Sequence, residues 1–171
     1  TWLLLSGAVH LLIEGMYVFD RGNALVPHAL DLYAAGDWRY GRPRLEAGTR
    51  AMEAITALFE GPLCLAVAYA AVRGLSWRHP AQLLLTTCQL YGLAWFALHP
   101  RFDAPGAQHF TADPVLFWTI AYGLNAVWGF VCPMLWLSSW RALNNAMFGG
   151  HLVLWVPEDA LEEAGEGEEE E

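Results

Sequence analysis

Four apolar segments make up most of this chain, and they limit its fold more than any other feature. None of them contains lysine or arginine, and each is close to the roughly 20 residues that a helix needs to cross about 30 Å of hydrocarbon. Backbone polar groups in lipid must be satisfied within the segment, which favours helices. We therefore predict an all-α fold, a membrane-spanning helix bundle with four spans in this chain. These spans run from Trp2 to Phe19, from about Met52 to Val72, from Ala81 to Leu98 and from Val115 to Ser138.

The acidic charge of the chain is concentrated at its C-terminal end. The formal net charge is −9, and residues 158–171 hold nine acidic and no basic residues, so the preceding part is formally neutral. The sequence has no basic patch of the kind that binds nucleic acid, and we expect no nucleic-acid partner. We expect a transmembrane helix bundle over residues 1–145, a short interfacial segment over 146–157 and a disordered acidic tail over 158–171.

The connections between the spans are uneven. Residues 20–51 are long and polar, and they contain Gly36-Asp37 and Arg42-Pro43, two pairs that are typical of turns. Residues 100–114 are rich in proline and glycine. We expect both connections to be loops outside the bundle.

Two groups of polar residues inside the first two apolar segments have helical spacing. His10 and Glu14 are four apart, while Glu53, Thr56 and Glu60 are three and four apart. Residues at these spacings share one face of a helix. An ionisable group at bilayer depth costs several kcal/mol, roughly 3 or more at the helix centre, so it usually faces the bundle interior and serves a function.

Three of these residues, His10, Glu14 and Glu53, each have two interpretations, one catalytic and one structural. His10 and Glu14 can store a proton and pass it on, which suits acid–base catalysis near neutrality. Alternatively, His10 bonds a backbone carbonyl and Glu14 lies near the water boundary. Glu53 either lines a site or pairs with Arg50 at the interface. Glu60 lies deeper in its segment, so an interfacial interpretation fits it less well than it fits Glu53.

The third and fourth segments add further polar and aromatic candidates. Asn125 and Trp128 are three apart. The amide can hold a carboxylate or a ligand hydroxyl, and the indole face can stabilise a cation. Both residues can instead serve helix packing alone. Gln89 and Tyr91 either line the same cavity or bond between helices.

The cysteines indicate core positions. Cys64, Cys88 and Cys132 each fall in an apolar segment without a CxxC pattern, which favours small core residues over a disulfide or a metal site. No nucleophile–base–orienter set, phosphate loop or metal-ligand cluster is visible in the sequence, and neither a metal nor a cofactor is implied.

Five stretches of the chain carry a family resemblance. They occur in order over roughly residues 8–140, and each is weak alone but fairly specific in combination. The stretches are HLLIEGMYV, LYAAGDWRY, MEAITALFEGPL, QLLLTTCQLYG and LFWTIAYGLNAVWGFVCP. Together they resemble the emopamil-binding protein family of sterol Δ8–Δ7 isomerases, which carry the EXPERA domain. The resemblance implies a multi-pass, five-helix protein of the endoplasmic reticulum membrane, whose first helix would precede Thr1.

The resemblance also implies a set of site residues. The family's H-x-x-x-E, M-E-x-x-T and N-x-x-W motifs line the sterol pocket. The residues that match these motifs here are His10, Glu14, Glu53, Thr56, Asn125 and Trp128. Tyr33 and Tyr40 match aromatic residues near the pocket mouth.

The implied reaction moves a ring double bond of a sterol from the 8 to the 7 position. A proton is added at carbon 9, which leaves a cation at carbon 8, and a proton is then lost from carbon 7. His10, Glu14 and Glu53 would transfer the protons, with the order among the acids left open. Trp128 would stabilise the cation through its ring face. No redox cofactor or metal is required.

Two positions depart from the isomerase pattern and keep a second function open. Leu93 follows Q-x-Y-G, where the isomerases carry an acid, and Glu60 stands where they often carry an aromatic residue. An acid at that position is closer to the emopamil-binding-like paralogue. The alternative is a non-catalytic membrane protein that binds sterols or amphipathic amines, as the sigma-2 receptor branch does. The implied partners are a sterol substrate, amphipathic amine inhibitors and the lipid bilayer, and a homodimer stays open.

Overall fold

The computed structural model describes residues 1–19, 27–41, 46–103 and 107–149. Within this part of the chain, four helical spans are long and apolar enough to cross a membrane, which confirms the predicted all-α bundle. The second span begins five residues earlier than predicted because Glu46 caps it, accepting hydrogen bonds from the Gly48 and Thr49 amides. The four spans are Trp2–Phe19, Ala47–Arg73, Arg78–Phe102 and Pro114–Phe148.

Three of the four spans contain a π-helical segment between α-helical ones, in the middle of the first two and near the start of the fourth. In the first, the Gly15 amide donates to the His10 carbonyl, and in the second the Gly61 amide donates to the Thr56 carbonyl. Such π turns are rare and occur frequently at functional sites. The segments are α1 (Trp2–Ala8), η1 (Val9–Glu14) and α2 (Gly15–Phe19); α4 (Ala47–Ile55), η4 (Thr56–Glu60) and α5 (Gly61–Arg73); and α7 (Pro114–Leu116), η5 (Phe117–Gly123) and α8 (Leu124–Phe148).

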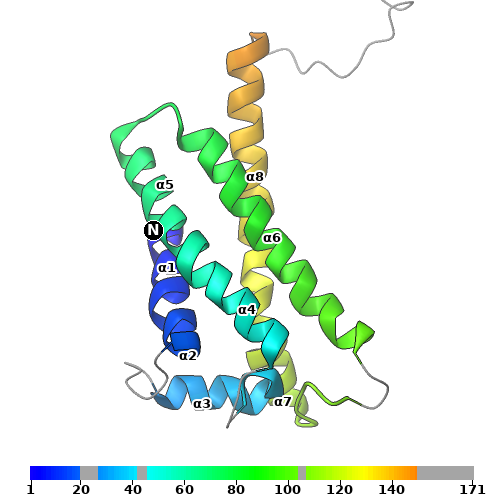
Figure 1. Ribbon diagram of the computed structural model, residues 1–171. Helices are drawn as coiled ribbons and strands as arrows, with labels where there is room; N and C mark the ends of the chain where they lie inside the picture. Colours follow the sequence, from blue (N-terminus) through cyan, green and yellow to red (C-terminus); the bar gives the residue numbers. More distant parts are fainter. Residues whose placement is uncertain (20–26, 42–45, 104–106, 150–171) are drawn as a thin grey trace, which may run out of the picture.

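The spans pair along their lengths. The first span lies beside α4 and α5, and the third, α6 (Arg78–Phe102), lies beside α8 (Figure 1). The segments η1 and η4 approach closely at Gly61, where an added Cβ would lie 2.7 Å from Leu11 Cγ and 3.3 Å from His10 Cβ. The absence of a side chain at Gly61 therefore lets the two π segments that carry the polar residues meet.

The connection after the first span contains a helix that we did not predict from the sequence. Helix α3 (Pro27–Gly36) crosses one end of the bundle (Figure 1), and a 3₁₀ turn, η3 (Trp38–Tyr40), follows it. Leu30 packs with Tyr17 and Tyr40 in a buried cluster, so apolar contacts hold this polar segment against the bundle. The helix ends at Gly36, as the predicted turn requires, whereas Arg42-Pro43 lies outside the described residues.

A buried ion pair anchors the end of that connection. Arg39 and Asp37 are 2% and 0% exposed, and Arg39 Nη2 lies 2.6 Å from Asp37 Oδ2. The guanidinium lies 4.5 Å from the centre of the Phe96 ring and donates to the Phe96 carbonyl. The Asp37 backbone also forms an antiparallel bridge with Phe110. These contacts tie two connections to α6 at the same end of the bundle.

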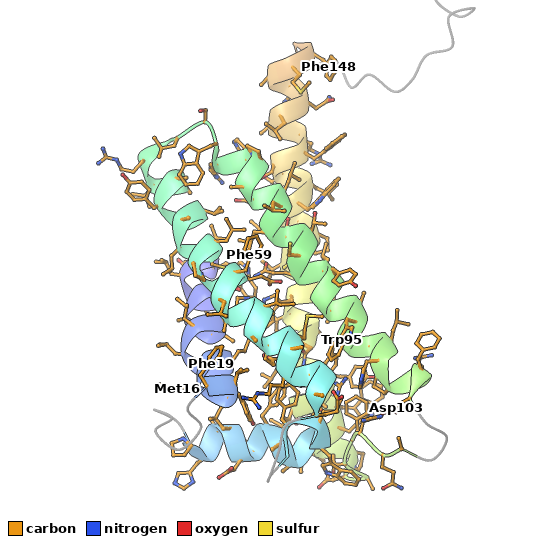
Figure 2. The ribbon with its side chains drawn as sticks, viewed as in Figure 1. Met16, Phe19, Phe59, Trp95, Asp103 and Phe148 are labelled. Carbon is orange, nitrogen blue, oxygen red and sulfur yellow. The ribbon has the colours of Figure 1, made fainter. Side chains whose placement is uncertain are left out.

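Two helices continue beyond their predicted ends. Helix α6 passes through Pro100 to Phe102, so the connection over residues 100–114 is shorter than expected. Helix α8 continues to Phe148 (Figure 2), past the expected boundary at residue 145, and ends where Gly149 takes the left-handed conformation. The acidic tail and most of the expected interfacial segment lie outside the described residues.

The outer and inner faces of the spans differ in character. Phe130 and Met134 of α8 are 75% and 69% exposed, as expected of side chains that face lipid. The cysteines are free thiols, of which Cys64 and Cys132 are buried and Cys88 is half-buried. The buried residues of the spans are largely small or polar, which is the composition that close packing of membrane helices favours.

Candidate acid–base site

Two adjoining cavities lie between the spans and share one wall. The first, about 80 Å³, is lined by carboxyl, imidazole and amide groups together with apolar side chains, and we call it the polar cavity. The second, about 290 Å³, is largely apolar. The residues common to both linings are Glu14, Tyr40, Glu53, Asn125 and Trp128. The apolar cavity is completed by Val9, Ile13, Tyr17, Ala29, Leu30, Tyr33 and Leu124. A hollow of this kind suits an elongated apolar molecule whose reactive part meets the shared wall.

His10 and Glu14 form the centre of the polar cavity. His10 Nδ1 lies 2.6 Å from Glu14 Oε2, and the imidazole is nearly buried at 4% exposure. The Thr56 hydroxyl, from the second span, donates to the same Glu14 oxygen and is also within 2.9 Å of the Glu53 carbonyl. The alternative in which His10 bonds a backbone carbonyl is therefore not the arrangement found.

Glu53 is a buried cavity residue. It is 8% exposed and accepts a hydrogen bond from the Tyr40 hydroxyl. Within the described residues, no ion pair joins it to Arg50. Burial, together with the nearby Glu53 carboxyl group, raises the pKa of Tyr40 well above its ordinary value, so the phenol stays protonated as a donor.

Glu60 lies on the opposite side of the His10 ring from Glu14. Its Oε2 atom is 3.8 Å from His10 Nε2, and the residue is 3% exposed. Glu14 and Glu60 are brought to the two edges of one imidazole by η1 and η4. The histidine is consequently placed between two carboxyl groups that come from different spans.

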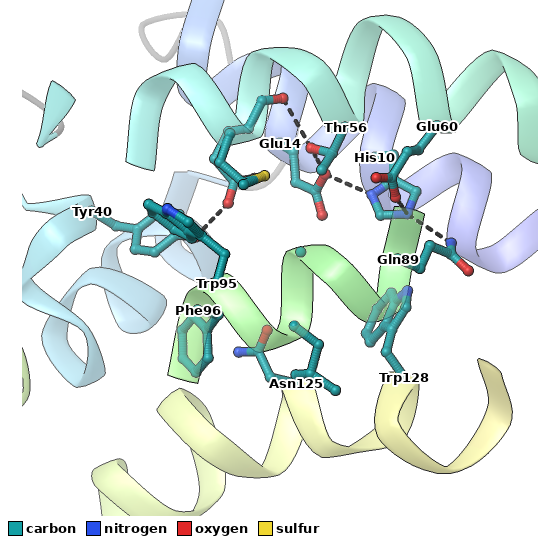
Figure 3. A pocket seen from close by; sticks show the side chains of 14 residues that line it. His10, Glu14, Tyr40, Thr56, Glu60, Gln89, Trp95, Phe96, Asn125 and Trp128 are labelled. Carbon is teal, nitrogen blue, oxygen red and sulfur yellow. Dashed lines mark hydrogen bonds and ion pairs between the residues drawn. The ribbon is translucent and has the colours of Figure 1, made fainter. Parts of the chain in front are cut away.

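Asn125 and Trp128 form the wall across the cavity from Glu14 and Thr56 (Figure 3). The Asn125 amide nitrogen donates to the Tyr33 hydroxyl at 2.8 Å and to the Ala121 carbonyl at 2.8 Å. The Trp128 ring centre lies 6.1 Å from that of His10. The indole ring thus lies opposite the acids, where its face could stabilise a developing positive charge.

Helix α6 contributes Gln89, which lines the polar cavity. Its amide nitrogen is 2.9 Å from Ser6 Oγ and 3.1 Å from His10 Nε2. Tyr91, two residues further on, is 69% exposed on the outer face and does not line the cavity. Of the two residues considered in this span, only Gln89 belongs to the site, because positions two apart lie on opposite sides of a helix.

Sequence reasoning did not include Ser6 among the candidates. Ser6 is fully buried, and its hydroxyl lies 3.2 Å from His10 Nε2 and 3.3 Å from Trp128 Nε1. Its position four residues before His10 was an available signal, since that spacing places both on one helix face.

The arrangement can move protons to and from an apolar molecule. Carboxyl groups from two spans, Glu14 and Glu53, border the same hollow, with a histidine behind one and a tyrosine behind the other. Two carboxyl groups in one poorly solvated site do not readily ionise together. Such a pair can therefore supply one acid and one base, which is the requirement for shifting a double bond.

The fold and the site define a class, a multi-pass membrane protein with an acid–base cavity enclosed by its spans. The sequence profile of EXPERA, the expanded EBP superfamily, matches residues 27–139. This chain belongs to the EBP family.

Curated relatives match most of the chain. A "Probable 3-beta-hydroxysteroid-Delta(8),Delta(7)-isomerase" of Oryza sativa subsp. japonica is 29% identical over 154 residues, or 86% of this chain and 68% of the relative. The 3-beta-hydroxysteroid-Delta(8),Delta(7)-isomerase of Mus musculus is 32% identical over 151 residues, which are 85% and 64% of the two chains. The isomeliandiol synthase MOI2 of Melia azedarach is 26% identical over 84% of this chain and 68% of its own. The matches thus span about two thirds of the relatives' length.

Proposed function

We propose that this protein is a 3β-hydroxysteroid Δ8–Δ7 isomerase. The observation that carries the proposal is the placement of Glu14 and Glu53, from two different spans, on the wall shared by a polar and an apolar cavity. The names of the relatives from rice and mouse support the same reaction. The alternative of a non-catalytic binder needs neither the second carboxyl group nor the histidine.

In the proposed reaction, the steroid rings occupy the apolar cavity with carbons 7 to 9 at the shared wall. One carboxyl group delivers a proton to carbon 9, and the electrons of the 8,9 double bond form the new C–H bond. The resulting cation at carbon 8 is neutralised when the second carboxyl group removes a proton from carbon 7. Those C–H electrons become the 7,8 double bond, so the reaction consumes no net proton.

The remaining residues have supporting roles in this proposal. His10 exchanges a proton with Glu14, and Thr56 holds the same carboxyl group in place through its hydroxyl. The Trp128 ring stabilises the cation, an interaction worth about 2 kcal/mol or more when desolvated. Asn125 and Tyr33 bind each other and shape the wall beside it. Tyr40 orients Glu53, while Gln89 and Glu60 flank His10.

The test is complementation of a yeast strain that lacks its own sterol isomerase, using the full-length gene. A functional protein restores Δ7 sterols, and in D₂O the product gains deuterium at carbon 9, because that proton comes from an exchangeable carboxyl group. Glu14→Gln and Glu53→Gln should each lower turnover at least about 100-fold, the usual contribution of an acid or base.

The matched control is Asp31→Asn, which removes an exposed carboxyl group of α3 outside both cavities. It should leave Δ7 sterol production unchanged. A well-expressed wild-type protein that produces no Δ7 sterol would count against the isomerase. Full activity of both Gln variants would count equally against the proposed site.

The cellular setting and inhibitors are further parts of the proposal. We place the protein in the endoplasmic reticulum membrane, as its family resemblance implies. Amphipathic amines should inhibit it, because an ammonium group at the shared wall resembles the cation at carbon 8. Competition between an amine and the steroid in isolated microsomes tests both statements.

A further inference from the structure

One buried hydroxyl connects the histidine to the aromatic wall of the site. Ser6 Oγ lies 3.2 Å from His10 Nε2, 2.9 Å from Gln89 Nε2 and 3.3 Å from Trp128 Nε1. The serine is 0% exposed. Three different spans, the first, third and fourth, therefore meet at this single oxygen atom.

The direction of each hydrogen bond follows from the chemistry of the partners. An indole N–H is a donor only, so Trp128 donates to Ser6. The Cys132 thiol donates to Gln89 Oε1 at 3.1 Å, which turns the amide nitrogen of Gln89 towards Ser6 as a second donor. A hydroxyl oxygen has two lone pairs and one proton. With both lone pairs occupied, Ser6 has only its own proton left. The Cys64 sulfur also lies beside Ser6 but is a weak acceptor, so the proton points to the stronger acceptor, His10 Nε2.

The consequence is a defined form of the imidazole. His10 Nε2 accepts from the Ser6 hydroxyl, and the Gln89 amide nitrogen at 3.1 Å is a second donor to it. A nitrogen that faces two donors carries a lone pair and no proton. The proton of neutral His10 is then on Nδ1, where it points to Glu14 Oε2 at 2.6 Å.

Glu60 makes this choice of tautomer consequential. Its carboxyl group is 3.8 Å from Nε2 and would accept a proton from that nitrogen. A histidine protonated on Nε2 would donate towards Glu60 and present a lone pair to Glu14. The Nδ1–H form instead donates a hydrogen bond to Glu14, the carboxyl group on the wall that both cavities share, and this bond favours the ionised form of Glu14.

We propose that Ser6 is a positioning residue of the site, which holds neutral His10 in the Nδ1–H form and links the imidazole to Trp128 through one oxygen. This inference rests on the proposed function for its effect on turnover, but the tautomer is a property of the protein alone. Ser6 acts through His10 and Trp128 and does not line the cavity.

The first experiment measures the tautomer by NMR of the full chain, labelled with ¹⁵N-histidine, in lipid nanodiscs. His10→Gln identifies the signals. We expect a protonated Nδ1 and an unprotonated Nε2 in the wild type, and a shift towards the Nε2–H form in Ser6→Ala. Ser139→Ala is the matched control, because Ser139 is equally buried and lies 3.3 Å from His79 Nδ1, away from both cavities. A wild-type His10 protonated on Nε2 or on both nitrogens, or a tautomer unchanged in Ser6→Ala, would overturn the proposal.

The second experiment measures steroid turnover. Ser6→Ala should lower kcat about tenfold, the effect of losing one buried hydrogen bond, with a smaller change in KM. Ser6→Cys retains a weak donor and should recover part of the loss, which a merely misfolded variant would not. An altered tautomer with unchanged kcat would refute the positioning role. Absence of turnover in the wild type would refute the isomerase but leave the NMR result standing.

Discussion

The hydroxyl of Tyr40 donates a hydrogen bond to the carboxyl group of Glu53. Tyr40 belongs to the connection outside the bundle, whereas Glu53 lies within the second span. A segment whose sequence predicts a polar loop thus holds one of the acids of the site. The position of that acid depends on how α3 and η3 close the end of the bundle.

Removing the Tyr40 hydroxyl tests this dependence. Tyr40→Phe should lower steroid turnover about tenfold, equivalent to about 1.4 kcal/mol, because Glu53 loses a donor. The measurement is the rate of Δ7 product formation in microsomes. Tyr91→Phe, at an exposed tyrosine of α6, should have no effect. Equal rates for Tyr40→Phe and the wild type would show that Glu53 does not need this partner.

The Trp128 ring should contribute through its face. We expect turnover to fall in the order Trp128, Trp128→Phe and Trp128→Leu, because a phenyl face attracts a cation more weakly than an indole face and an alkyl group does not do so at all. The range is about 0.5–2 kcal/mol, or roughly 2- to 30-fold. Trp118→Leu, at a tryptophan that is 66% exposed, is the control. If the Phe and Leu variants turn over equally, the ring face plays no part.

The close approach at Gly61 should limit what that position accepts. Gly61→Ala would place a methyl group 2.7 Å from Leu11 Cγ, so the two π segments would have to separate. We expect a loss of about 1–3 kcal/mol in stability, measured by thermal unfolding in detergent, together with lower turnover. An alanine at Gly92, where nothing lies within 4 Å of an added Cβ, should not lower the unfolding temperature. Comparable unfolding temperatures for both variants would contradict the close contact.

Glu46 should make stability depend on pH. Burial alone would raise the pKa of Glu46, but hydrogen bonds from the Gly48 and Thr49 amides outweigh it and hold the pKa below its ordinary value of 4.5. A carboxyl group whose pKa is lowered on folding stabilises the fold above its unfolded pKa, and this contribution is lost as the pH falls through the folded pKa. The cap is worth about 1 kcal/mol.

Glu46→Gln should therefore unfold at a lower temperature than the wild type at neutral pH, and the two should converge once the pH falls below the lowered pKa of Glu46. Thermal unfolding across this range gives the comparison. Asp31→Asn serves as the reference, because Asp31 does not cap a helix. A difference that persists unchanged in acid would show that ionisation of Glu46 is not its source.

Some parts of the site could be predicted from the sequence because they are local. The pairing of His10 with Glu14 follows from their spacing on one helix, and the structure brings them to 2.6 Å. Other parts could not be predicted. The contacts of Tyr40 with Glu53 and of Asn125 with Tyr33 join residues 13 and 92 positions apart, and no periodicity in the sequence relates them.

The sequence alone determined the four membrane-spanning helices of the described residues and which of their polar groups are at bilayer depth. Both follow from the length and hydropathy of single segments, since a helix in lipid satisfies its own backbone. Only the tertiary structure decided which polar groups face one another, that α3 closes the end of the bundle and that Ser6 contacts His10. These depend on the rotation of each helix about its axis, which the π turns and the close approach at Gly61 set through packing between spans.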